Sequence, residues 1–324
     1  MITMYYPYFR GKQYDLITIR ENADLLAQSN FIPIVEPVKE TLSGLTRTLD
    51  AVSTAQGKLI LIVNPENGDH VGNSDAIHSL FQNELKDHSN ISVGILLTEE
   101  IKVEKVEELS NSFENRPITL IHAGFSDGRL LSESIKINSL NPHHVFFEEY
   151  CGKLYRKHFR NQHRVLLRDG FQRRANRLHP AVEFFSDIHA TFPEEGMNGF
   201  GDFLIVGDEY SETGGPAYAV AIHLTFIDPH KDDGMYLHHF KSIRHDTPTD
   251  PAGKFAEALD KLVAELNQTE THLLRTKAVE EFVELHKRGH FPGLGYVKKL
   301  SMQHHIETLA HYFLQQNQQN ALLS

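Results

Sequence analysis

Hydrophobic residues in the first two thirds of this chain fall into short continuous runs, which alternate with segments where they recur every three or four positions. A run of four to six apolar residues is typical of a strand buried on both faces, and the wider spacing is typical of an amphipathic helix. Eight runs occur, at residues 5–10, 31–35, 58–63, 91–98, 117–122, 144–149, 164–168 and 203–206. Helical spacing follows most of them, at residues 14–28, 45–52, 75–85, 103–113, 130–137 and 181–188.

This alternation predicts a parallel sheet, because neighbouring parallel strands need a crossover connection that is usually a helix. The count of eight strands favours a closed TIM-like (β/α)₈ barrel of the α/β class over an open doubly wound sheet. The last run, Phe203 to Val206, stops at Gly207-Asp208. We interpret it as the eighth strand, with its carboxyl end at Asp208.

The remaining third of the chain predicts an addition to the barrel. Two apolar stretches at 217–228 and 235–243 flank the turn-forming segment Pro229 to Gly234, which is typical of a β-hairpin. Three helical patterns follow at 251–267, 276–287 and 301–315. We therefore expect a barrel formed by residues 1–213 and roughly 251–267, a β-hairpin insertion at 214–250, and a C-terminal helical cap at 268–324.

Composition narrows the class of protein. The hydrophobic content of 40% and charged content of 23% over 324 residues are globular values. Cys151 is the only cysteine, so neither an intrachain disulfide nor a zinc site built on cysteines is expected. No stretch approaches about 18 consecutive apolar residues, and no secretory leader is evident, so a cytoplasmic protein without a membrane partner is expected. No glycine-rich phosphate-binding motif follows a predicted strand, so no nucleotide cofactor is indicated.

Several segments resemble the uncharacterised "beta protein" family, named from a T4-type phage protein and found also in bacteria. The matching residues are Tyr-Pro-Tyr-Phe-Arg-Gly-Lys-Gln at 6–13, Ile-Pro-Ile-Val-Glu-Pro at 32–37, Arg-Asp-Gly-Phe at 168–171, Ala-Val-Ala-Ile-His-Leu at 219–224 and His-Phe-Pro-Gly-Leu-Gly at 290–295. The resemblance covers most of the chain. It implies a barrel-like fold and a phage or phage-defence context, and it brings no catalytic residues with it.

Candidate chemistry lies where the predicted strands end, because the loops at that end of a (β/α)₈ barrel form the active site. The polar residues found there are Arg10, Glu36, Asn64, Thr98, His122, Glu149, Arg168, Asp169 and Asp208. Carboxylate oxygens suit a hard cation, so Glu36, Glu149, Asp169 and Asp208 predict a site for Mg²⁺ or Mn²⁺. The alternative is a network of ion pairs between these acids and nearby arginines.

Within this set we assign roles. His122, Glu36 and Asp169 are the candidate catalytic residues, with His122 as the acid or base. Arg10, Lys39, Asn64, Arg168 and Arg174 are the candidate substrate-binding residues, because arginine suits a phosphate. Glu149 is preferred to Glu148, because it shares the parity of Val145 and Phe147 along the strand. His223 lies in an apolar strand and is interpreted as a structural histidine.

Charge is unevenly distributed along the chain. The net charge is −11, yet Lys153 to Arg177 contains nine Lys and Arg residues against a single acid, Asp169. Such a segment attracts phosphates or nucleic acid, or it pairs with the acidic remainder of the protein. Aromatic residues among the arginines would allow base stacking.

Two functions remain open from the sequence. The first is a metal-dependent hydrolase or phosphodiesterase acting on a phosphate-containing or nucleic-acid substrate. The second is a noncatalytic recognition or scaffold subunit that binds a separate protein effector such as a nuclease.

Overall fold

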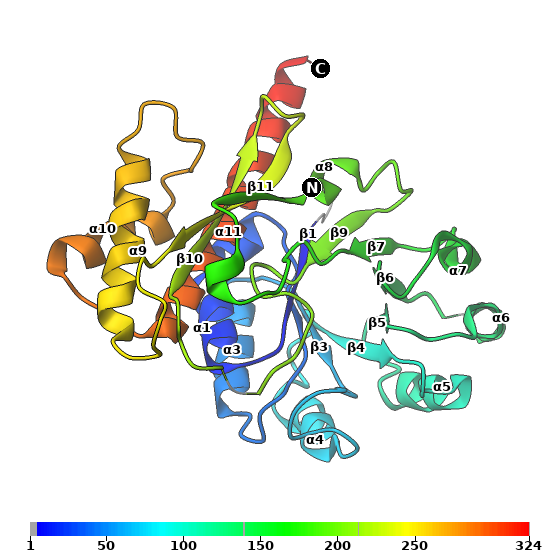
Figure 1. Cartoon of the computed structure of the whole chain (residues 1–324). Coiled ribbons are helices and arrows are strands. Elements are labelled where there is room, and N and C mark those ends of the chain that lie inside the picture. The colour runs from blue at the N-terminus through cyan, green and yellow to red at the C-terminus, as the bar shows by residue number, and fades with distance from the viewer. Residues whose placement is uncertain (1–4, 139, 213, 324) are drawn as a thin grey trace. The chain divides into compact units, whose positions relative to one another are not determined.

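Eight parallel strands close into a barrel in the computed structural model, which describes residues 5–138, 140–212 and 214–323 (Figure 1). The strands follow the order β1-β2-β3-β4-β5-β6-β7-β9, and β9 pairs with β1 to close the ring. They are β1 (Tyr5–Phe9), β2 (Ile34–Val35), β3 (Leu59–Ile62), β4 (Ile91–Leu97), β5 (Ile118–His122), β6 (His143–Phe147), β7 (Arg164–Leu167) and β9 (Gly199–Asp202). The predicted (β/α)₈ barrel is therefore confirmed.

Side-chain alternation along these strands separates the barrel interior from its outer wall. Ile60 and Ile62 of β3 belong to the interior cluster, whereas Leu59 and Leu61 point to the helices, and all four are buried. A strand that buries both faces has no polar positions, which explains its continuous apolar run. The interior is filled by aromatic and branched side chains, including Tyr6, Tyr8, Ile34, Leu96, Ile121, Val145, Phe147, Val165, Leu167 and Phe203.

Helices follow the first six strands. They are α1 (Gln13–Glu21), α2 (Ala23–Gln28), α3 (Ser43–Thr54), α4 (Asp75–Asn83), α5 (Val103–Ser112), α6 (Gly128–Ile137), α7 (Lys153–Arg156) and the 3₁₀ turn η1 (Lys157–Phe159). Their buried residues recur at helical spacing, as in Leu45, Thr48, Leu49 and Val52 of α3.

The eighth strand differs from the prediction. The apolar run at 203–206 lies outside any strand, although its first three residues are buried, and the barrel is closed by β9 just before it. β9 reads Gly-Phe-Gly-Asp, so it lacks the apolar run that marks the other strands. Gly201 is required there because a Cβ atom at this position would lie 2.3 Å from the backbone oxygen of Tyr6. The strand consequently ends at Asp202, not at Asp208.

The chain divides into two compact units, each described by itself below. The first comprises Met1–Asp169 with Thr191–Phe203, and the second comprises Gly170–Ala190 with Leu204–Ser324. The short helix α8 (Ile188–Thr191) spans the division. The domain boundary expected at residue 213 lies outside the described residues. We expected residues 170–190 and 204–212 to be part of the barrel, whereas they belong to the second unit together with the C-terminal segments.

The second unit is built on a three-stranded antiparallel sheet in the order β10-β11-β8. The hairpin of β10 (Ala221–Asp228) and β11 (Gly234–Lys241) is confirmed, with Asp228 opposite Gly234 and His223 opposite His239. The helix expected at 181–188 is wrong: these residues form β8 (Val182–Ser186), which pairs with β11. The 3₁₀ turn η2 (Asn176–Leu178) precedes β8.

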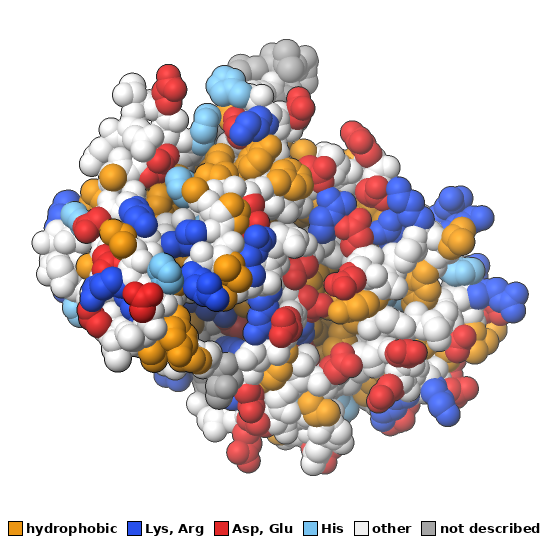
Figure 2. Space-filling model, in the orientation of Figure 1, with side chains coloured by type: hydrophobic (Ala, Val, Ile, Leu, Met, Phe, Trp, Pro, Cys, Tyr) orange, Lys and Arg blue, Asp and Glu red, His pale blue; other side chains and the backbone are white. Residues whose placement is uncertain are grey.

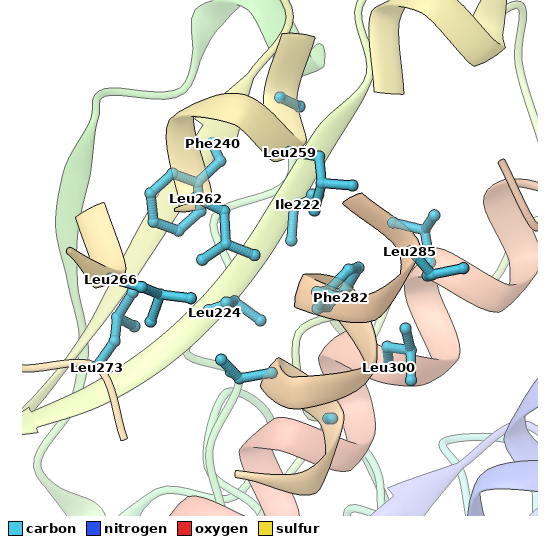
Figure 3. Packing of buried hydrophobic residues seen from close by; sticks show 14 of the residues in the cluster. Ile222, Leu224, Phe240, Leu259, Leu262, Leu266, Leu273, Phe282, Leu285 and Leu300 are labelled. Atoms are coloured by element: carbon cyan, nitrogen blue, oxygen red, sulfur yellow. The ribbon is translucent and has the colours of Figure 1, made fainter. Parts of the chain in front are cut away.

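One face of this sheet packs against helices. Ile222, Leu224 and Phe226 of β10 share a buried cluster with α9 (Pro251–Leu266), α10 (Lys277–Arg288) and α11 (Leu294–Leu323), as Figure 3 shows for the labelled residues. Phe255, Leu259 and Leu262 of α9 belong to this core, so α9 is a helix of the second unit and not the outer helix of the barrel that we expected. No helix in the described part of the chain is long and apolar enough to cross a membrane.

Candidate metal centre

The mouth of the barrel, where its strands end, contains a fully buried carboxylate at Glu36. Tyr8 Oη donates to Glu36 Oε2 (2.9 Å), and Arg10 Nη1 forms an ion pair with the same oxygen. Glu36 Oε1 accepts the backbone N–H groups of Glu66 (3.0 Å) and Asn67 (2.9 Å) and the Asn67 side-chain amide (3.0 Å). The Arg10 guanidinium also lies over the Tyr8 ring, 5.0 Å from its centroid.

These contacts use both oxygens of Glu36. A buried charge is stable only when it is paired and hydrogen-bonded, and Glu36 meets that condition with groups from the ends of β1 and β2 and the loop after β3. The structure therefore brings Arg10 and Glu36 together as a structural ion pair. It leaves Glu36 poorly suited to the catalytic or metal-ligating role that we expected.

Other predicted residues of the mouth have structural partners. Asn64 donates to the Leu96 oxygen (2.8 Å) and accepts from the Leu96 N–H (2.8 Å), which joins the end of β3 to β4. Arg168 pairs with Glu148, whereas Glu149, the acid that we preferred, is exposed. The alternation of side chains along β6 nevertheless placed Val145 and Phe147 correctly, because both line the barrel interior.

A cleft of about 610 Å³ opens beside Asn64 and Thr98, at the carboxyl ends of β3 and β4. Its charged lining residues are Glu66, Glu100, Lys102, Glu104, Lys105 and Glu108. Acids outnumber lysines there, so this part of the mouth does not match the phosphate site expected for Arg10, Lys39 and Arg168. Lys39 itself is exposed.

His122 lies away from the mouth interior. It follows Ile121 on β5, whose side chain points into the barrel, so the His122 ring points outward. Its Nδ1 is 2.6 Å from Tyr155 Oη, and its Nε2 is 2.9 Å from His144 Nδ1. Burial, and then the neighbouring His144, hold the pKa of His122 well below its ordinary value. The structure thus places His122 in the barrel wall and not at the mouth, and its role as an acid or base stays a prediction.

The predicted quartet of metal-ligating acids is divided between the units. Glu36, Glu149 and Asp169 belong to the first unit, and Asp208 belongs to the second. Within the described residues, no group of three potential ligands with suitable spacing includes any of the four. Asp169 and Asp208 are both partly exposed.

The basic segment from Lys153 to Arg177 is largely paired with acids. Of its nine cationic side chains, five form ion pairs, which join Lys153 and Arg156 to Glu195, Arg168 to Glu148, Arg173 to Glu209 and Arg174 to Glu183. Around α7, on the right of Figure 2, Lys and Arg side chains are interspersed with Asp and Glu side chains. These contacts match the alternative in which the basic segment pairs with acids of the protein. Nucleic-acid binding by this segment stays a prediction.

Three histidines of the second unit form a group that our sequence reading missed. We call His179, His223 and His239 the histidine cluster; each offers a nitrogen, and these nitrogens all lie within 4.8 Å of one another. His223 and His239 face each other directly across β10 and β11. They lie on the sheet face opposite to the hydrophobic core, because Ile222 and Phe240, their neighbours along the strands, belong to that core. His179 comes from the segment between η2 and β8.

The rings are closely packed. His223 Nδ1 and His239 Nδ1 are 2.6 Å apart, and the His179 and His239 rings stack with their centroids 4.3 Å apart. Phe171 packs edge-on against His223, with the ring centroids 5.4 Å apart. His179 and His239 are 2% and 3% exposed, whereas His223 is partly exposed. A ligand could therefore reach the cluster past His223.

Glu183 of β8 joins two members of the cluster. Its Oε1 lies 3.2 Å from His179 Nδ1 and 2.9 Å from His239 Nε2. Its Oε2 pairs with Arg174 Nη2 at 2.5 Å. The other nitrogen of His179, Nε2, is buried without a hydrogen-bond partner in the structure. A buried nitrogen of this kind calls for an explanation, and an absent metal ion is one of the recognised ones.

All three imidazoles favour the neutral form that binds metals. Burial lowers the pKa of His179, and it lowers the pKa of His223 to about 3. Burial, followed by the neighbouring His223, lowers the pKa of His239 to about 2. Neutral imidazole is a preferred ligand of Zn²⁺, and three histidines with one open position is a known catalytic arrangement. Nitrogens bound to one Zn²⁺ at about 2.0–2.1 Å lie roughly 3.4 Å apart, so small ring rotations would suffice.

The sequence contained part of the signal for this cluster. The predicted turn at Pro229 to Gly234 would pair Asp228 with Met235 and place His223 opposite Phe240, one residue away from its observed partner His239. The contribution of His179 could not be found in this way, because it depends on β8, which we had predicted as a helix.

Comparisons with known proteins add little. No protein-family model matches the chain, and no curated protein matches it. The solved structures with similar folds include two crystal forms of N-acetylneuraminate lyase from Mycoplasma synoviae, both 10% identical. Form II covers 97% of this chain and 98% of that chain with a TM-score of 0.44, and form I covers 62% and 69% with a TM-score of 0.40.

An amidohydrolase from Brucella melitensis is 9% identical, covering 94% of this chain and 72% of that chain with a TM-score of 0.35. Likenesses at this level carry no argument about the function of this chain. The resemblance to the beta protein family also stays a prediction.

Proposed function

We propose that this protein is a metal-dependent hydrolase whose metal ion is bound by His179, His223 and His239. The observation that carries the proposal is the convergence of three imidazoles within 4.8 Å, with one buried nitrogen lacking a partner. The donor set replaces the one that we expected from the sequence. Three nitrogen ligands favour a transition metal such as Zn²⁺ over Mg²⁺ or Mn²⁺, which prefer oxygen ligands.

The charges around the cluster favour a phosphate-containing substrate. Arg174 and Lys241 both act electrostatically on His179, and Lys241 Nζ donates to the backbone oxygen of the same residue. Glu183 offsets only one of these positive charges. An anionic oxygen, from hydroxide or from a phosphate ester, is consequently the fourth ligand that the surroundings stabilise best.

The chemistry of such a centre follows from its open position. A bound Zn²⁺ lowers the pKa of a coordinated water to about 7 and stabilises negative charge on the group under attack. In this chain, the three histidines would hold the ion, Arg174 and Lys241 would favour the phosphate, and partly exposed His223 would mark the side of entry. The noncatalytic recognition subunit is the alternative outcome of the tests below.

Metal binding is tested first on chelator-treated protein. We expect one equivalent of Zn²⁺ or Co²⁺ to bind, and Zn²⁺ at a hundredfold excess over its Kd to stabilise the fold by about 2.7 kcal/mol. His223→Ala should abolish this stabilisation, because it removes the most accessible ligand. His230→Ala, which changes an exposed loop histidine of the same unit, is the matched control and should behave as the wild type.

Hydrolysis is tested with bis(p-nitrophenyl) phosphate and p-nitrophenyl phosphate on the zinc-loaded protein. Turnover that His223→Ala removes and His230→Ala keeps would support the hydrolase. Stoichiometric zinc binding without turnover of any phosphate ester would instead favour a structural centre in a noncatalytic subunit. A stabilisation by Mg²⁺ that survives His223→Ala and is lost in Asp208→Asn would restore the carboxylate site predicted from the sequence.

A further inference from the structure

The two oxygens of Glu183 make different contacts. Oε1 is shared by His179 Nδ1 and His239 Nε2, at 3.2 and 2.9 Å, and Oε2 is held by the Arg174 guanidinium at 2.5 Å. The side chain of Glu183 is only 15% exposed. Its orientation is therefore fixed from both ends, by Arg174 on one side and by the two rings on the other.

These contacts determine the tautomers of two histidines. An ionised carboxylate oxygen can only accept hydrogen bonds, so the ring nitrogens that contact it must carry protons. His179 is then protonated at Nδ1 and His239 at Nε2. The lone pairs remain on His179 Nε2, the buried nitrogen without a partner, and on His239 Nδ1, which faces His223 Nδ1 at 2.6 Å. In the metal-free protein His239 Nδ1 then accepts a hydrogen bond from His223 Nδ1, and a bound metal ion would take the place of that proton.

We infer that Glu183 is the positioning residue of the metal centre: by holding His179 and His239 through one oxygen, it selects the nitrogens that bind the metal. This inference rests on the proposed metal-binding function. A carboxylate that accepts from the second nitrogen of a metal-bound histidine fixes the orientation of the ring and raises its basicity as a ligand. Here one carboxylate does so for two ligands at once.

Glu183 also sets the local charge. Arg174 acts electrostatically on both His179 and His239, and Lys241 acts on His179. Both positive charges oppose the binding of a cation. Glu183 contacts two of the three histidines and carries the negative charge that offsets this repulsion, so its removal should weaken binding even if the rings stay in place.

Glu183→Gln tests the inference with almost no change in volume. A glutamine amide cannot satisfy all three partners, because an oxygen turned toward the histidines places its NH₂ group against the Arg174 guanidinium, and the reverse orientation places it against the ring N–H groups. We expect affinity for Zn²⁺ and Co²⁺, measured by calorimetry on the full chain, to fall about 10–100-fold. The visible absorption spectrum of bound Co²⁺ should also change, because the ligand geometry changes.

A control removes a more exposed ion pair from the same unit. Glu209 pairs with Arg173 at 2.9 Å, and neither residue belongs to the histidine cluster. Glu209→Gln should keep the wild-type affinity and Co²⁺ spectrum. If Glu183→Gln binds Zn²⁺ as tightly as Glu209→Gln does, the inference is overturned while the proposed function stands.

The tautomers provide a readout that does not need the metal. Nitrogen-15 NMR of metal-free wild-type protein should show His179 protonated at Nδ1 and His239 at Nε2, and Glu183→Gln should change at least one of them. Opposite tautomers in the wild type would contradict the inference, whatever the protein binds. Correct tautomers in a wild-type protein that binds no transition metal would instead overturn the proposed function.

Discussion

The barrel mouth and the histidine cluster each contain a carboxylate held by an arginine, yet the two sites differ in what remains unsatisfied. Glu36 is fully buried, and both of its oxygens accept donors from Tyr8, Arg10, Glu66 and Asn67. Glu183 is also engaged on both oxygens, but the histidines that it holds keep lone pairs, and one buried nitrogen has no hydrogen-bond partner. Saturation is the mark of a structural network, whereas a buried lone pair suits a ligand.

This difference is the reason for proposing the metal site at the histidines and not at the acids of the barrel mouth. Carboxylates are good ligands for hard cations only when their oxygens are available, and a neighbouring arginine competes with the cation for them. Neutral imidazoles carry no charge to be neutralised, so their lone pairs survive burial. The carboxylate site therefore stays a prediction, and the histidine cluster carries the proposal.

The largest expected loss of stability comes from a substitution that breaks the hydrogen-bond network at the barrel mouth. Glu36→Gln leaves the Arg10 charge without its partner, and removing one member of a buried pair costs about 3–5 kcal/mol. Urea unfolding followed by far-UV circular dichroism should show this loss, while the zinc-dependent stabilisation stays. A variant that is as stable as the wild type but no longer responds to metal would place the metal site at the mouth after all.

A smaller effect on stability is expected at acidic pH from buried histidines outside the two sites. Burial lowers the pKa of His144 in the barrel wall to about 3 and that of His304 in the second unit to about 4. Both values lie below the unfolded value of about 6.5, so the native state binds fewer protons than the unfolded state at acidic pH. Stability should be undiminished above about pH 6.5 and should fall as the pH drops toward 4, by roughly 1.4 kcal/mol per pH unit for each such histidine.

Unfolding free energies measured between pH 7 and 4 check this expectation. His304→Asn should reduce the change of unfolding free energy with pH by the contribution of one histidine, about 1.4 kcal/mol per pH unit. The exposed control His245→Asn should leave this change as in the wild type. A slope that is the same in all three proteins would show that the pKa of His304 is not lowered in the native state. His304 contacts Thr276 and the Thr225 backbone, so the neutral-pH stability of each variant must be compared as well.

The smallest expected effects on stability come from an exposed and a buried cationic side chain of the basic segment. Lys153 and Arg156 both pair with Glu195, but their side chains are 79% and 5% exposed. Lys153→Ala should cost at most about 1 kcal/mol, because exposed pairs contribute little. Arg156→Ala should cost more, because it also removes buried packing. Equal costs in thermal or urea unfolding would show that the pairing with Glu195, and not burial, sets the energy.

Much of the architecture could be predicted from local patterns. The run Leu59–Ile62 identifies a strand because a strand buried on both faces requires apolar residues at every position. The turn formers from Pro229 to Gly234 predicted the hairpin, although its register, which pairs His223 with His239, differs by one residue from the one that this turn implies. These features depend on residues that are close in sequence, so the sequence by itself determined them.

Tertiary structure decided the rest, because the deciding contacts are between residues far apart in the chain. Gly199–Asp202 pairs with β1 because Gly201 allows the close approach of Tyr6, a requirement that no hydrophobic pattern shows. Whether Glu36 could bind a cation depended on donors that reach it from the loop after β3. His179 and Glu183 join His239 only once β8 pairs with β11, and that pairing turns separate histidines into a candidate metal centre.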